Sequence, residues 1–246
     1  MEHRHTRYLE LLAAAPIPRG DWRQGEIEHV PEPERFIPLE ERLMERYRSR
    51  GMPEQFGCVG VMHEDEWFVI FRHPVLYPPK QGDVPIDAGH ISAVYRGESL
   101  GQRSLFLLLL LPDGRLLLNL TYRRPSGTWK LEGQGRITRI GETLDTALSA
   151  CVEVETGAVI CSVTPLGFIA SDRGLVGPPV PLFLVGITKP MKPIADPTIA
   201  AQIHLSPVEL DQAFLKGSFT HEGRTYVCDD SYTAFALYQA RLRGLI

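Results

Sequence analysis

The stretch LEGQGRITRIGETLDTALSACVEVETG, residues 131–157, decides the fold because three local patterns meet in it. It begins at the end of an apolar run, continues through a glycine-rich segment, and passes into a region with the apolar spacing of a helix. We expect that helix over residues 142–156, closed by Gly157, because glycine accepts the left-handed conformation common at helix ends. A strand, a glycine-rich loop and a helix therefore follow one another here.

Two leucine-rich runs precede this stretch, within SLFLLLLLPDGRLLLNLTYRR at residues 104–124. They flank the segment PDGR, in which proline presets φ and glycine can take a positive φ, so the runs are expected to form a hairpin. Their continuous apolarity is typical of strands buried on both faces. Further strands are expected at 159–171 and 180–190, and helices at 206–217 and around 230–244. Together these elements predict an α+β domain in which helices cover both sides of a mixed sheet.

The chain before this domain is expected to contain two parts. Residues 1–55 form an N-terminal helical extension, with helices near 6–14 and 37–50, and residues 56–97 form a small β-rich unit. The domain that holds the hairpin and the helix then spans residues 98–246.

Composition and charge argue against several classes of protein. The 246 residues carry a formal net charge of −4, which gives no bulk electrostatic attraction to nucleic acid. The longest apolar run, 105–111, is far shorter than the ~18 residues that a membrane-spanning helix needs. The four cysteines are widely spaced and form no CxxC pair, which argues against structural zinc and favours reduced thiols. We therefore expect a cytoplasmic protein with no nucleic-acid partner and no membrane partner.

The segment from Gly135 to Gly157 resembles the signature of the Nudix hydrolases. That signature is a Gly, five residues, a Glu, seven residues, and then Arg-Glu-apolar-x-Glu-Glu-x-Gly. Here six residues separate Gly135 from Glu142, so the loop is one residue longer, and the final positions read ACVEVETG at 150–157. The spacing of the signature positions from Glu142 to Gly157 is kept, while most of the charged residues of the signature are replaced.

The flanking sequences are similar to the ADP-ribose and ADP-sugar pyrophosphatase branch of that family. The similarity lies in LLLNLTYRRPSGTWKLEGQGRI at 116–137 and GSFTHEGRTYVCDDSYTAFALYQARL at 217–242, and it covers about residues 90–246. It implies a Nudix-like α/β/α sandwich and a pocket for a small molecule of the nucleoside diphosphate type. The β-rich unit then corresponds to the N-terminal unit of that branch, which implies a homodimer.

The spacing of side chains along the expected helix separates two faces at 100° per residue. The polar sector is expected to contain Asp145, Thr146, Ser149, Glu153 and Thr156. Glu155 instead falls between Leu144 and Leu148 on the apolar side, where a carboxylate is seldom buried without a partner. Glu155 is therefore the residue of this helix that a purely structural role leaves unexplained.

The resemblance implies a divalent metal site at this helix, and the residues present fit it poorly. Glu155 occupies the position of a metal-ligand Glu, but the partner position one turn earlier is Cys151, and Ala150 replaces the arginine that braces the cluster. Mg²⁺ and Mn²⁺ prefer clustered carboxylate oxygens, for which a thiol is a poor substitute. The general base of that branch corresponds to Asp172, although SDRG is also a good turn sequence. Metal-dependent hydrolysis is therefore expected to be lost or altered, with Mg²⁺ or Mn²⁺ as cofactor only if it survives.

Ligand-binding residues are expected close to this helix. Arginines at a strand end can hold a diphosphate in bidentate fashion, a tryptophan can stack on a base, and backbone N–H groups of the glycine-rich segment can cradle phosphate. The same residues also have structural explanations, as strand-end charges, a core aromatic side chain, a helix first-turn acid or a buried thiol. The candidate ligand-binding residues are Arg123, Arg124, Trp129, Glu132, Glu142 and Cys151, and the candidate catalytic residues are Glu155 and Asp172.

Three functions remain open from the sequence. The first is a Nudix-fold protein that binds a small ligand and whose hydrolysis is lost or altered. The second is an active hydrolase that cleaves ADP-ribose or another nucleoside diphosphate sugar. The third is a metal-independent enzyme that uses Glu155 as general acid or base.

Overall fold

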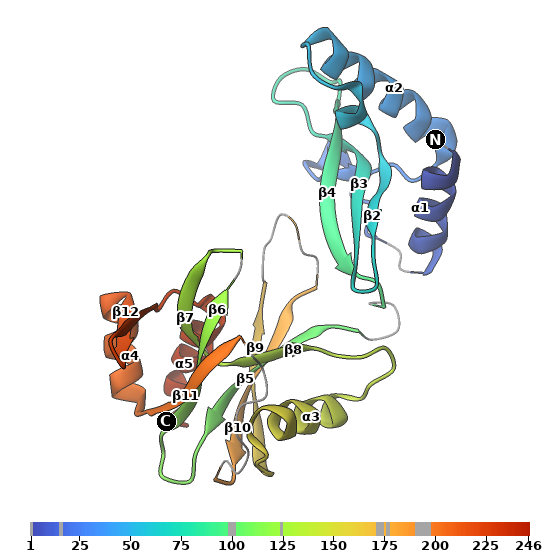
Figure 1. Ribbon diagram of the computed structural model, residues 1–246. Coiled ribbons are helices and arrows are strands. Elements are labelled where there is room, and N and C mark those ends of the chain that lie inside the picture. The colour runs from blue at the N-terminus through green and yellow to red at the C-terminus, as the bar shows by residue number, and fades with distance from the viewer. Residues whose placement is uncertain are drawn as a thin grey trace. The chain divides into compact units, whose positions relative to one another are not determined.

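The chain forms two compact units, which Figure 1 shows as separate groups of helices and strands. The computed structural model describes residues 2–14, 17–97, 102–123, 125–170, 175, 178–189 and 198–246. Unit 1 consists of residues 1–102 together with 172–178, and unit 2 consists of residues 103–171 and 179–246. Across the described residues, no helix combines the length and the apolar character needed to cross a membrane.

Unit 1 packs helices against a small antiparallel sheet. Its helices are α1 (Glu2–Ala14), η1 (Trp22–Gln24), α2 (Pro33–Ser49) and η2 (Glu54–Gly57), and its strands are β1 (Glu28–His29), β2 (Gly60–Glu64), β3 (Phe68–Tyr77) and β4 (Ile86–Tyr95). Strand β3 is central, because it pairs with each of the other three strands. The helices expected near 6–14 and 37–50 are confirmed as α1 and α2, and α2 begins earlier because Pro33 is well suited to a first helical turn.

A chain of hydrogen-bonded polar side chains runs through the core of unit 1. The Tyr8 hydroxyl lies 2.6 Å from His29 Nε2 and 3.0 Å from His73 Nδ1, and His73 Nε2 lies 2.6 Å from Ser92 Oγ. The Tyr8 and histidine rings are all buried. Burial lowers the pKa of His29 to about 4 and the pKa of His73 to about 3, so both rings are neutral at pH 7.

Unit 2 is built on one mixed sheet, in which the described residues form nine strands. The strand order is β12-β13-β7-β6-β5-β10-β9, with β11 also paired to β6 and β8 also paired to β5. The strands are β5 (Ser104–Leu110), β6 (Leu116–Arg123), β7 (Thr128–Glu132), β8 (Gln134–Ile137), β9 (Ile160–Ile169), β10 (Val180–Ile187), β11 (Ile199–Leu205), β12 (Ser218–His221) and β13 (Arg224–Val227). The helices are α3 (Leu144–Thr156), α4 (Pro207–Lys216) and α5 (Ser231–Leu242).

Alternate residues of the central strands point to opposite helical layers. Leu107 of β5 packs with Leu148 of α3, while Leu108 packs with residues of α4 and α5 on the other face. Both leucines are fully buried, and each such side chain contributes about 1.5–3 kcal/mol of transfer free energy. The expected mixed sheet with helices on both sides is therefore confirmed as an α/β/α sandwich (Figure 1).

Local capping signals fix the ends of the helices in unit 2. The Gly157 backbone is left-handed, with φ of 65°, and it ends α3 as expected. Ser206 and Glu209 form a capping box at the start of α4, which confirms the N-cap expected there. The expected start of α3 at residue 142 is wrong, because Thr143 is the N-cap and accepts the Thr146 N–H. Glu142 therefore precedes the helix and is not an acid of its first turn.

The division of α3 into faces also differs from the expectation at both ends of the helix. Thr156, expected on the polar sector, is fully buried, and its hydroxyl donates to the Val152 carbonyl at 2.7 Å. That bond satisfies the hydroxyl within the helix, which allows the side chain to face the sheet. Leu144 and Val154, expected on the apolar side, are exposed. Contact with the sheet, rather than the helical wheel alone, thus decides which residues of α3 are buried.

We expect unit 1 to lose stability below neutral pH. The pKa values of His29 and His73 lie below the value of about 6.5 that unfolded histidines have, so the unfolded chain binds more protons between about pH 3 and 6.5. Stability is therefore full above about pH 6.5 and falls as the pH falls, with a slope of up to ~1.4 kcal/mol per pH unit for each histidine. Amide hydrogen exchange, corrected for its intrinsic pH dependence, measures this loss. As the pH falls, the protection of amides in β3 and β4 should decrease more than the protection of amides in β5 and β6.

The variant His73→Gln is the control for this prediction, because glutamine keeps hydrogen-bonding groups and does not titrate. Its acid response should be shallower than that of the wild type. Equal acid sensitivity of the two sheets, or an unchanged response in the variant, would contradict the assignment.

Candidate functional site

The carboxylate of Glu155 lies within a network of side-chain amides between α3 and the sheet. Its Oε2 accepts a hydrogen bond from Asn119 Nδ2 at 3.0 Å. Asn119 Oδ1 in turn accepts from the amides of Gln134, at 3.3 Å, and Gln202, at 3.0 Å. Gln202 also donates to the Glu155 carbonyl oxygen at 3.4 Å. The C-terminal part of α3 is therefore joined through polar groups to β6, β8 and β11.

The alternation of β6 explains why Asn119 faces this network. Its neighbours Leu118 and Leu120 belong to the core under α4 and α5, so Asn119 points to the α3 side of the sheet. Asn119 is only 4% exposed, and a buried amide needs hydrogen-bond partners. Glu155 accepts from the Asn119 amide nitrogen, and the two glutamines donate to its oxygen, so both ends of the amide have partners.

Cys151 lies one turn before Glu155 on the same side of α3. Its Sγ is 4.0 Å from Glu155 Oε1, and the side chain is buried. Burial and the neighbouring carboxylate raise the pKa of the Cys151 thiol to about 12. The group is therefore a neutral thiol at physiological pH and does not offer a thiolate nucleophile.

The described residues near Glu155 do not fit the Mg²⁺ or Mn²⁺ site that the resemblance implies. These ions take several oxygen ligands, mostly from carboxylates and water. In the described part of the chain, no group of three or more His, Cys, Asp or Glu side chains is placed to hold a metal ion. The Glu155 oxygen that faces β6 receives an amide N–H, and the position one turn earlier is a thiol. Asp172, the candidate base, lies outside the described residues.

The Glu142 carboxylate is held by Arg136 and by the Arg139 backbone. Arg136 of β8 pairs with Glu142 at 3.1 Å, and the Arg139 N–H donates to the same carboxylate at 2.8 Å. Arg136 also donates to the Ala147 carbonyl at 3.4 Å, so one guanidinium ties β8 to the start of α3. Glu142 is therefore engaged in positioning the segment before the helix.

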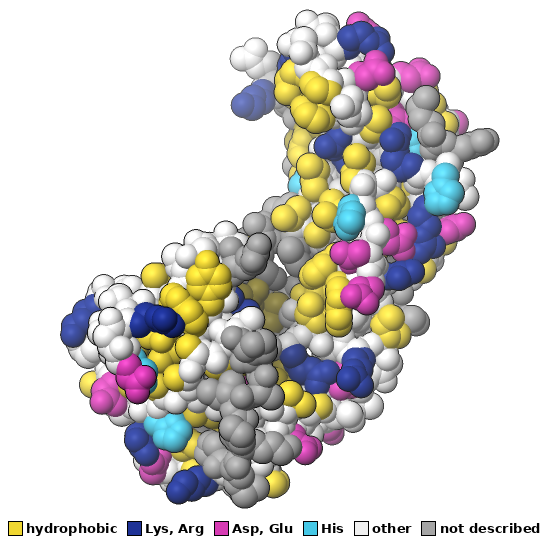
Figure 2. Space-filling view, viewed as in Figure 1, with side chains coloured by type: hydrophobic (Ala, Val, Ile, Leu, Met, Phe, Trp, Pro, Cys, Tyr) yellow, Lys and Arg dark blue, Asp and Glu magenta, His cyan; other side chains and the backbone are white. Residues whose placement is uncertain are grey.

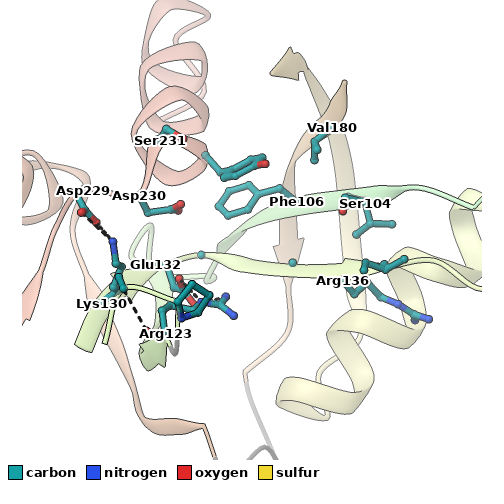
Figure 3. Close-up of a pocket in the computed structure, with 17 residues that line it drawn as sticks. Ser104, Phe106, Arg123, Lys130, Glu132, Arg136, Val180, Asp229, Asp230 and Ser231 are labelled. Atoms are coloured by element: carbon teal, nitrogen blue, oxygen red, sulfur yellow. Dashed lines mark hydrogen bonds and ion pairs between the residues drawn. The ribbon is translucent and has the colours of Figure 1, made fainter. Parts of the chain in front are cut away.

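Charged side chains do not form one continuous basic surface on the face of unit 2 seen in Figure 2, where cationic, acidic and uncharged side chains are interspersed. The notable concentration of charge is instead in a pocket of about 680 Å³, shown in Figure 3. Strands β5 to β8, the start of β10 and the N-terminal end of α5 contribute its walls. Phe106 and Tyr232 stack at one side, with their ring centroids 5.7 Å apart.

Ion pairs line the part of this pocket that β6, β7 and the segment before α5 form (Figure 3). Arg123 binds Glu132 in bidentate fashion, with Nη2 2.5 Å from Oε1 and Nε donating to Oε2 at 2.9 Å. Lys130 Nζ lies 2.6 and 2.8 Å from the two carboxylate oxygens of Asp229. Glu132 is only 8% exposed, and its burial raises its pKa, although Arg123 opposes the change. The wall thus contains two cations whose present partners are both carboxylates.

The structure brings some of the predicted residues to this pocket and places others elsewhere. Arg123 and Glu132 line it together, whereas Cys151 and Glu155 belong to the amide network. Arg124 lies outside the described residues. Glu142 approaches the pocket only through Arg136, which is one of its lining residues.

Trp129 packs on the other side of β7, away from the ion pairs. Its ring makes edge-to-face contacts with Tyr122 and Tyr226, and the Arg224 guanidinium carbon lies 4.2 Å from its centroid. Both the aromatic contacts and the cation–π contact stabilise the strand packing. The structural explanation for Trp129 is therefore the one with geometric support.

The glycines of GQG allow close packing of strands, and Gly133 and Gly135 also line the pocket. Gly135 lies in β8 and pairs with Phe106 of β5. A Cβ at Gly133 would lie 2.5 Å from Phe106 Cζ and 2.9 Å from the Leu107 carbonyl, so a larger residue does not fit. The Gly133 N–H donates to Thr233 Oγ1 at 2.8 Å. The expected glycine-rich loop is therefore wrong in this segment, because its backbone is used in the sheet and in contact with α5.

Sequence reasoning missed several pocket residues, namely Lys130, Arg136, Asp229 and Tyr232. The strand TWKLE contains a signal for Lys130. Trp129 and Leu131 pack in the hydrophobic cluster that includes residues of α5, so Lys130, which lies between them in the strand, faces the opposite side of the sheet. The start of α5 lies about one hundred residues further along the chain, and nothing in the local pattern shows that it meets β7.

Comparison with solved structures supports the fold. Neither a protein-family model nor a curated protein sequence matches the chain. A crystal structure described as an ADP compounds hydrolase matches with a TM-score of 0.53 and 12% sequence identity, over 77% of this chain and 95% of that chain. At this identity the likeness concerns the fold, a Nudix-like α/β/α sandwich around a mixed sheet.

We expect one of the four cysteines to react rapidly in the native protein. Cys161 is exposed, whereas Cys58, Cys151 and Cys228 are buried, and burial raises the pKa of Cys151 to about 12 and of Cys228 to about 11. Titration with an aromatic disulfide reagent should therefore show one fast thiol, and four after unfolding. The fast phase should disappear in Cys161→Ser. A fast phase that survives this change and disappears in Cys151→Ala would refute the assignment of a buried, neutral Cys151.

Proposed function

We propose that this protein binds a small anionic ligand of the nucleoside diphosphate type in the unit 2 pocket, and that it does so without metal-dependent diphosphate hydrolysis. The observation that carries the proposal is the setting of Glu155. Its carboxylate is bonded to the Asn119 amide and lies beside the neutral thiol of Cys151. This arrangement satisfies the carboxylate without other acidic side chains.

The pocket has the dimensions and chemistry for such a ligand. Its volume of about 680 Å³ lies within the range of roughly 300–1,000 Å³ that is usual for small-molecule sites. Arg123, Lys130 and Arg136 provide cationic donors among the lining residues, and guanidinium groups suit bidentate contacts with phosphate. Phe106 and Tyr232 provide an aromatic surface in the same pocket. An anionic group and an apolar or aromatic group can therefore be bound together.

A metal-independent enzyme is the second candidate, and the geometry of Glu155 is the observation that favours it. The amide hydrogen bond holds the Glu155 carboxylate in a defined position, as a general acid or base requires. The high pKa of Cys151 argues against this thiol as a nucleophile in the same site. The homodimer implied by the resemblance remains a prediction.

The proposal predicts that ADP-ribose binds and is not cleaved. ³¹P NMR with Mg²⁺, with Mn²⁺ and with EDTA should show no nucleoside monophosphate. Calorimetry should show binding that Lys130→Ala weakens about tenfold or more, because a hydrogen bond to a charged group contributes about 1.5–3 kcal/mol. The matched control is Lys216→Ala, an exposed lysine at the end of α4, which should leave the affinity unchanged.

Other outcomes identify the competing functions. Metal-dependent release of a monophosphate that Glu155→Gln abolishes would mean that the hydrolase survives, and the proposal would be wrong. Turnover that resists EDTA and depends on Glu155 would establish the second candidate instead. Absence of binding would refute the assigned ligand class.

A further inference from the structure

The two cations of the pocket wall have partners in very different surroundings. Arg123 is 53% exposed, while its partner Glu132 is 8% exposed. Lys130 shows the reverse arrangement, because it is 18% exposed and its partner Asp229 is 53% exposed. A ligand that takes the cation from each pair therefore leaves one carboxylate in water and the other within the protein.

A buried carboxylate that loses its cation becomes costly. Two opposite charges in contact attract each other, and a desolvated charge that loses its partner has no water to replace this attraction. Neutralisation by a proton is the usual response of such a group. Glu132 already has a raised pKa with Arg123 in place, because burial outweighs the ion pair.

The charges that face Glu132 come from three elements. Arg123 of β6 contacts it directly, Lys130 lies two residues before it on β7, and Asp230 at the start of α5 acts on it as a like charge. A bound anion adds a further negative charge beside the carboxylate. Asp230 and the ligand thus both favour the neutral form once Arg123 has turned to the ligand.

We propose that the anionic ligand takes Arg123 from Glu132, and that Glu132 takes up a proton when the ligand binds. This inference rests on the proposed function and adds a mechanism to the same pocket. The balance is simple: the free protein, the anion and one proton give a complex that contains a neutral Glu132 carboxyl group. Asp229 keeps its contact with water when Lys130 turns to the ligand, since its side chain is 53% exposed.

Calorimetry with ADP-ribose tests the exchange. The diphosphate ester of this probe keeps its two charges near neutral pH, so protons that are taken up come from the protein or the buffer. Binding enthalpies in two buffers of different ionisation enthalpy give the number of protons, which should lie between about 0.3 and 1 per ligand. The affinity should fall as the pH rises, by up to about tenfold per unit once Glu132 is ionised in the free protein.

Two matched variants locate the proton. Glu132→Gln should still bind ADP-ribose, with no proton uptake and no pH dependence. Asp229→Asn should retain the full uptake, whatever its effect on affinity. If Glu132→Gln does not fold, the wild-type affinity at about pH 6, 7 and 8 decides, because the proposal requires the affinity to fall across this range.

The remaining outcomes separate the inference from the proposed function. Binding without proton uptake, or uptake that persists in Glu132→Gln, overturns the exchange and leaves the proposed function standing. Failure of ADP-ribose to bind at all overturns both.

Discussion

The hydrogen bond from the Asn119 amide to the Glu155 carboxylate connects the two layers on which the site of unit 2 depends. It links α3 to β6 at 3.0 Å, and through Asn119 it reaches Gln134 and Gln202 on β8 and β11. Glu155 is half-buried, and the neutral amide of Asn119 supplies its carboxylate with a hydrogen-bond donor. Helix α3 corresponds to the helix that carries metal ligands in the signature that the sequence resembles. Here hydrogen bonds from side-chain amides attach α3 to the sheet.

The amide network and the pocket lie next to each other on one face of the sheet, because Asn119 of the network is paired directly with Glu132 of the pocket. The amide network forms where α3 covers β6, whereas the pocket lies beyond it, at β7, β8 and the start of α5. Arg136 connects the pocket to the start of α3, since it lines the pocket, pairs with Glu142 and donates to the Ala147 carbonyl. In the function that we propose, the paired cations and the stacked rings bind the ligand, and Glu155 does not contact it.

The fold could be predicted because its signals are local, and the site could be predicted only in part because its contacts are not. The leucine runs, PDGR and the caps at Ser206 and Gly157 each act within a few residues, and all are confirmed. The helical wheel failed at Thr156, whose hydroxyl is satisfied inside the helix. The glycine-rich segment was misassigned because Gly133 meets Phe106, a contact between separate strands. The pocket joins β7 to α5 through Lys130 and Asp229, which no local pattern shows.

A double-mutant cycle between Asn119 and Glu155 tests the central claim most directly. The unfolding free energies of Asn119→Ala, Glu155→Ala and the double variant would be measured beside the wild type, with EDTA and with Mg²⁺. The account predicts a favourable coupling of about 1–3 kcal/mol that is the same in both conditions, because the bond needs no metal. No coupling in EDTA, together with stabilisation by Mg²⁺ that Glu155→Ala removes, would contradict it and restore Glu155 as a metal ligand.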